Sequence, residues 1–141
     1  MRLKRFHSLT AIAVIFGGLS PLWGWTPDEV PGLRYPRNAQ MARIEGVVVV
    51  ECSIAEDGTV SRVEVKSGHP VLGKAASENA KTWRFKRSGA ANEPSTVQLM
   101  FEFRLDGTCK TQCCNERFVF RYPDHVSVTS EQPGIEPQNL K

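Results

Sequence analysis

Residues 44–65 read IEGVVVVECSIAEDGTVSRVEV, and this stretch decides the fold. Two runs rich in β-branched residues flank an Asp57-Gly58 pair, which supplies the positive φ that a tight hairpin turn needs. The runs predict strands over 47–54 and 60–66. The first alternates only partly, because both faces of its four valines are apolar, and the second places Val63 and Val65 on one face and charged residues on the other. The stretch therefore predicts an antiparallel hairpin that packs on one face.

The residues around this hairpin predict two helices and a third strand. Residues 37–43, before the hairpin, predict a short helix. Pro70, after the hairpin, fits the first turn of a longer helix that buries one apolar stripe. Apolar residues then alternate without a break from Val97 to Leu105, which is the clearest strand pattern in the chain. We therefore predict an α+β fold: a small antiparallel three-stranded sheet with a packed helix, in the order ββαβ after a short N-terminal helix.

The 141 residues, 40% of them hydrophobic and 23% charged, suit one globular domain with appended segments. Beyond Asp106-Gly107 the strand pattern weakens, and the sequence indicates a cysteine-containing extension with a hairpin. We expect five parts, namely a signal peptide or N-terminal anchor at 1–25, a linker at 26–34, the domain at 35–105, the extension at 106–129 and a disordered tail at 130–141.

The N-terminal segment has the layout of an export signal. Arg2, Lys4 and Arg5 precede an almost wholly apolar stretch over 9–22, which is shorter than the roughly 20 residues that span a bilayer core. These three cations also carry the whole formal charge of +3. The rest of the chain is neutral, so the charge gives no reason to expect binding to nucleic acid.

Four cysteines fit an oxidising compartment, where thiols pair. Because adjacent Cys113 and Cys114 would close a strained small ring, we expect Cys109 or Cys52 to bond with one of them. Cys52 shares the core face of its strand, so simple packing is the alternative for that thiol. The spacing C-x-x-x-C-C lacks the paired C-x-x-C of structural zinc sites, so we expect no metal.

The sequence gives little reason to expect an enzyme. His69 and His125 lie at a strand-to-helix junction and in a turn, and Cys52 is predicted to face the core. Glu51, Glu56 and Asp57 are interpreted as surface and turn residues rather than catalytic carboxylates. We find no nucleophile motif or phosphate loop and expect no cofactor.

The ordered set of motifs over about 35–105 resembles the C-terminal domain of the TonB family. The resemblance rests on Tyr35-Pro36, Ala39, Arg43-Ile44-Glu45-Gly46, the Val-rich strand, Asp57-Gly58, Val63, Ser67-Gly68 and Trp83-Arg84-Phe85, the last closing the helix. The chain differs from TonB in its spacer, because only about ten residues separate Trp25 from Tyr35, at most roughly 35 Å when extended.

The resemblance implies a non-enzymatic protein of the periplasm or cell envelope of a Gram-negative bacterium, inner-membrane anchored if the N-terminal segment is uncleaved. Family domains add a short segment of an outer-membrane or other envelope protein to their sheet as an extra strand. The matching edge here would be the third strand, with a peptide-binding face of Thr96, Gln98, Met100, Glu102 and Arg104. The alternative is that this strand is an inner or capped strand, because the cysteine-containing extension could cover it. The alternative is a self-associating structural envelope protein, for instance a homodimer, with no energy-transducing role.

Overall fold

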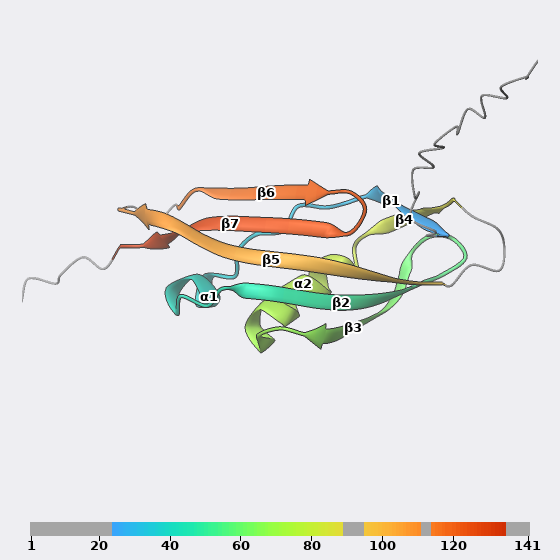
Figure 1. Cartoon of the computed structure of the whole chain (residues 1–141), viewed down its shortest axis with the longest axis horizontal. Coiled ribbons are helices and arrows are strands. Elements are labelled where there is room, and N and C mark those ends of the chain that lie inside the picture. The colour runs from blue at the N-terminus through green and yellow to red at the C-terminus, as the bar shows by residue number, and fades with distance from the viewer. Residues whose placement is uncertain (1–23, 89–94, 111–113, 135–141) are drawn as a thin grey trace, which may run out of the picture.

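The computed structural model describes residues 24–88, 95–110 and 114–134 (Figure 1). Seven strands and two helices lie in these ranges: β1 (Trp25–Glu29), α1 (Arg37–Met41), β2 (Gly46–Ile54), β3 (Val60–Ser67), α2 (Pro70–Ala80), β4 (Arg84–Arg87), β5 (Thr96–Cys109), β6 (Glu116–Arg121) and β7 (His125–Pro133).

The predicted hairpin is present as β2 and β3. Gly58 takes φ +86°, and the N–H of Ala55 donates to the carbonyl oxygen of Thr59 at 2.8 Å. The Asp57 carboxylate accepts from the Thr59 hydroxyl at 2.7 Å and from its N–H at 3.0 Å. These hydrogen bonds lower the pKa of Asp57, so this acid serves the turn.

The main sheet has five strands in the order β3-β2-β5-β7-β6, so the prediction of a three-stranded sheet is wrong. Figure 1 shows β5 in the middle, with β2 and β3 on one side and β7 and β6 on the other. β5 pairs antiparallel with β2 and parallel with β7. The cysteine-containing extension therefore belongs to the same sheet as the predicted domain.

A second, two-stranded sheet joins β1 to β4, and this corrects two expectations. The expected linker at 26–34 begins as a strand, and α2 ends at Ala80, so Arg84 and Phe85 belong to β4 and do not close the helix. Ion pairs link the strands, since Lys86 Nζ lies 2.6 Å from Asp28 Oδ1. The guanidinium of Arg87 stacks 4.9 Å above the Trp25 ring.

The core lies between the inner face of the main sheet and the two helices. α2 packs on β2 and β3, while α1 packs on β7. Alternate residues of each strand enter the core, as the strand period requires. The largest fully buried side chains are Trp83, Phe101, Phe103, Leu72, Leu99, Val48, Val50, Val126, Val128 and Cys52.

The expectation of a disordered tail is wrong for its first residues. β7 continues to Pro133, and Ser130 is only 1% exposed. The Ser130 hydroxyl accepts a hydrogen bond from the Gln40 amide at 2.8 Å, which ties β7 to α1. Residues 135–141, and nearly all of the expected signal segment, lie outside the described ranges. Within the described ranges, neither helix has the length and apolarity to cross a membrane.

Candidate functional site at the free edges of the sheet

The residues predicted to receive a partner strand lie on β5, but β5 is not an edge. Met100, Glu102 and Arg104 are opposite His125, Ser127 and Thr129 of β7. The prediction of an exposed edge is therefore wrong for residues 100–104, because β7 of the same chain takes that position there.

The hydrogen bonds show which backbone groups β7 uses. The N–H of Met100 donates to the Asp124 carbonyl at 2.8 Å, so by the alternation of a ladder Glu102 and Arg104 also turn their backbone groups towards β7. Thr96 and Gln98 precede the first β5–β7 pair. His125 Nε2 of β7 lies 3.4 Å from Glu102 Oε2 of β5, a contact that is an ion pair only when the imidazole is protonated.

The β6–β7 hairpin is a part of the core and not a removable cover. Val126 and Val128 are fully buried, and the Phe120 ring meets Trp83 edge to face with centroids 5.5 Å apart. Burying each large apolar side chain contributes roughly 1.5 to 3 kcal/mol. Removing the hairpin from β5 would lose several such contributions, so β7 occupies this side of β5 from Met100 onward.

A disulfide between Cys109 and Cys114 connects the end of β5 to the residues that lead into β6. It is one of the pairings that the sequence predicted. Cys52 is buried and unpaired, which agrees with the packing alternative for that thiol. Burial, with a smaller contribution from Glu51, raises the pKa of Cys52 to about 12, so the thiol is un-ionised at neutral pH. Cys113 lies outside the described residues.

We expect Cys109→Ser to lower the free energy of unfolding by about 2 kcal/mol, because the bond closes a short loop of the unfolded chain. Urea unfolding with and without reductant measures this. Reductant should shift the midpoint of the unsubstituted protein and leave the variant unchanged. A variant with unaltered stability would mean that the bond adds nothing to the attachment of the hairpin.

The sheet leaves two edges, β3 and β6, and β3 is the less receptive. Its outward charges are already paired, since Lys66 Nζ lies 3.4 Å from Glu51 Oε1 and 3.3 Å from Glu64 Oε1. Its pairing with β2 is interrupted by two register shifts. Charged side chains and irregularities of this kind are common protections of an edge strand.

β6, in contrast, is a regular edge with a continuous register on β7. The N–H of Glu131 donates to the carbonyl oxygen of Asn115, which makes these two a hydrogen-bonded pair. Alternation along an antiparallel ladder then directs the backbone groups of Glu116, Phe118 and Phe120 away from β7, towards the open side. These groups are what a further strand would bind.

The structure places each of the eight residues of the family motif in or beside a helix, a strand or a turn. The Tyr35 hydroxyl donates to the Ile44 carbonyl at 2.7 Å, and burial raises the pKa of Tyr35 to about 12. The indole N–H of Trp83 donates to Asn79 Oδ1 at 2.9 Å. The others are Pro36 before α1, Gly46 at the start of β2, Asp57 and Gly58 in the turn, and Arg84 and Phe85 in β4.

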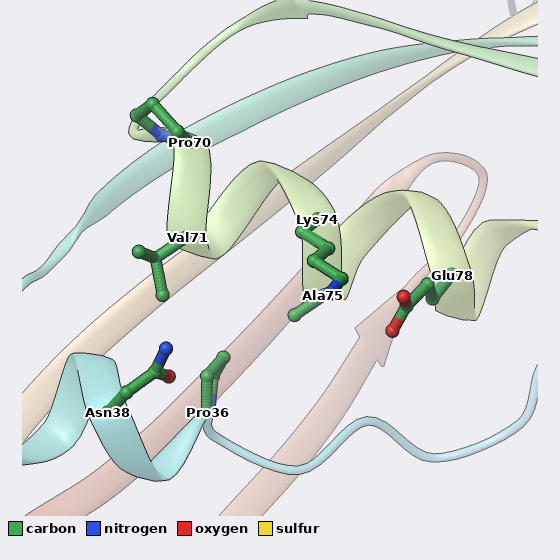
Figure 2. A pocket seen from close by; sticks show the side chains of 7 residues that line it. All are labelled: Pro36, Asn38, Pro70, Val71, Lys74, Ala75 and Glu78. Carbon is green, nitrogen blue, oxygen red and sulfur yellow. The ribbon is translucent and has the colours of Figure 1, made fainter.

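A groove of about 410 Å³ separates α1 from α2, with Val71 and Ala75 facing Pro36 and Asn38 (Figure 2). Lys74 and Glu78 are its charged lining residues, and the lining has no nucleophile beside a base. Within the described ranges, no group of three or more His, Cys, Asp and Glu residues could hold a metal ion.

The fold is a small α+β domain, and its main sheet has an edge strand with unpaired backbone N–H and C=O groups. Edges of this kind are surfaces through which domains bind extended protein segments. A family model described as the Gram-negative bacterial TonB protein C-terminal matches residues 31–105. This chain therefore belongs to the TonB C-terminal family, as the ordered motifs predicted.

Two relatives illustrate the similarity. The chain is 30% identical over 76 residues to Protein TonB of Klebsiella pneumoniae, which covers 52% of this chain and 30% of that protein. The solution NMR structure of the Pseudomonas aeruginosa TonB CTD is 27% identical, covers 56% of this chain and 84% of its own, and superimposes with a TM-score of 0.44. The chain thus spans less than a third of the length of the Klebsiella protein.

The β6 edge was not identified from the sequence. The predicted hairpin over 117–129 contains it, and the alternation Arg117-Phe118-Val119-Phe120-Arg121 was a usable signal for a strand with two different faces. The sequence allowed the cysteine-containing extension to cover β5, but it did not show that β7 would lie between β5 and β6.

Proposed function

We propose that this protein is an envelope protein-binding domain of TonB type, which takes part in transmembrane transport or envelope contacts by adding an extended segment of another envelope protein to its sheet. The proposal places it in the periplasm of a Gram-negative bacterium, as TonB-type domains are. No catalytic role is included.

The observation that supports this function best is the open edge of β6, where Glu116, Phe118 and Phe120 direct unpaired backbone groups outward. β-Strand addition draws its affinity from such groups and its selectivity from alternate side chains. Three of the five β5 residues that were expected to bind a partner strand, Met100, Glu102 and Arg104, already pair with β7. The receptive edge is therefore proposed to be β6.

The function is tested by screening extended segments of outer-membrane and periplasmic proteins against the whole chain. We expect binders to protect the Phe118 and Phe120 amides from hydrogen exchange and to leave Val63 and Val65 of β3 unchanged. Glu116→Pro should weaken binding about tenfold, because it removes one open N–H and places a ring against the incoming strand.

The matched control is Glu116→Ala, which removes the carboxylate but keeps the N–H. It should bind like the unsubstituted protein. Binding that ignores the proline, or protection that appears only on β3, would contradict the assignment to β6. Light scattering distinguishes the alternative of a structural, self-associating protein, which predicts a dimer without any added segment.

A further inference from the structure

The outer face of β6 carries two arginines with an exposed valine between them. Arg117, Val119 and Arg121 share this face because side chains alternate along a strand, and at about 3.3 Å per residue the two arginine positions lie about 13 Å apart. Val119 is 37% exposed, and both arginines are exposed.

Neither arginine is paired with a carboxylate anywhere in the described part of the chain. Their neighbours across the ladder, Thr129 and His125, supply no carboxylate. At the opposite edge of the sheet, the Lys66 ammonium already lies within 4 Å of two carboxylates. The β6 edge therefore offers two cations that a partner's carboxylates could approach.

The inner face of the same strand is apolar. Phe118 and Phe120 are half-buried and pack against the core, so each residue keeps part of its surface exposed to water. A strand added to β6 would place every second side chain next to these rings. Apolar side chains at those positions would remove the remaining ring surface from water.

We infer, on the basis of the proposed function, that β6 selects extended segments of the pattern acidic, apolar, any residue, apolar, acidic. The two acids lie opposite Arg117 and Arg121, and the two apolar residues lie beside Phe118 and Phe120. This pattern reads the same in both directions, so it suits a parallel or an antiparallel partner strand.

A second copy of β6 fits this edge poorly. When two copies pair antiparallel with their faces aligned about Val119, Arg117 lies opposite Arg121 of the other copy, which is a like-charge contact. When they align about Phe118, each Arg117 lies opposite a valine and no arginine meets an acid. The charges therefore favour a foreign acidic segment over self-association.

The experiment compares two blocked heptapeptides, Ser-Glu-Val-Thr-Val-Glu-Ser and its charge-swapped form Ser-Lys-Val-Thr-Val-Lys-Ser, titrated into the whole chain at low salt. We expect the acidic peptide to bind about tenfold more tightly, because two rim ion pairs are modest individually. Raising the salt to about 0.5 M should remove most of this preference through screening. Exchange protection of the Phe118 and Phe120 amides reports the position of each peptide.

The double variant Arg117→Glu with Arg121→Glu should reverse the preference, and Arg62→Glu on β3 is the matched control that should leave it unchanged. Equal protection of β6 by both peptides would overturn the charge selection and leave the proposed function intact. If neither peptide and no segment in the screen protected any edge amide, both the charge selection and the proposed function would be overturned. Thermal unfolding of each variant shows whether it is folded. If the double glutamate variant is unfolded, the double variant Arg117→Gln with Arg121→Gln takes its place, and it should abolish the preference for the acidic peptide.

Discussion

Trp83→Ala is expected to lower the free energy of unfolding by about 3 to 5 kcal/mol, the range for large aromatic side chains removed from a core. Trp83 is 1% exposed, and its ring meets Phe85, Phe101 and Phe120 with centroids 5.5 to 6.2 Å apart. These contacts join β4, β5 and β6. The variant should therefore loosen both sheets together, and urea unfolding followed by circular dichroism measures the loss.

Trp83→Phe separates the two contributions of this residue. The phenyl ring keeps much of the packing, but the indole N–H that donates to Asn79 Oδ1 at 2.9 Å is lost. We expect about 1 to 3 kcal/mol of destabilisation from the missing hydrogen bond and the smaller ring. If Trp83→Ala cost less than Trp83→Phe, the assignment of Trp83 as the centre of the core would be wrong.

Gly58→Ala is expected to destabilise the protein by about 2 to 4 kcal/mol, because both the backbone conformation and the space at this position exclude a side chain. The residue has φ +86°, and a Cβ would lie 2.0 Å from the Phe85 carbonyl oxygen, a backbone atom that cannot rotate away. The Gly58 carbonyl also accepts the Phe85 N–H at 2.8 Å. The turn between β2 and β3 thus fixes the position of β4.

Gly32→Ala is the matched control for this position. No atom lies within 4 Å of the Cβ that it would add, so we expect little loss of stability and a small gain from a stiffer unfolded chain. The thermal midpoints of the two variants should differ by at least several degrees. Equal midpoints would show that the contact between the turn and β4 is easily rearranged.

The hairpin, the two helices, the strand over 96–105 and the family could be predicted because each depends on short-range signals. The Asp57-Gly58 turn, the β-branched alternation and Pro70 at the first turn of α2 act within a few residues of themselves. The disulfide was narrowed to a few pairings by the strain of joining Cys113 to Cys114. None of these inferences required knowledge of which strands are neighbours.

The errors concern pairing between distant segments. The residues at 26–34 contain two prolines and resemble a linker, and their strand exists only because Arg84–Arg87 supplies its partner. Ser130–Pro133 is polar enough to suggest a tail, yet β5 and Gln40 hold it in the sheet. Propensity cannot report such partners, because the free energy comes from contacts far apart in sequence.

The sequence by itself determined that this protein is an α+β domain of the TonB C-terminal family with an Asp57-Gly58 hairpin at its centre. Only the tertiary structure decided which edge is open. The alternating pattern of β5 fits an edge strand and a central strand equally well. β5 is central because β7 pairs with it, and this pairing is favoured by the burial of Val126 and Val128 of β7 away from water. The same burial left β6 outermost, with its arginines facing outward.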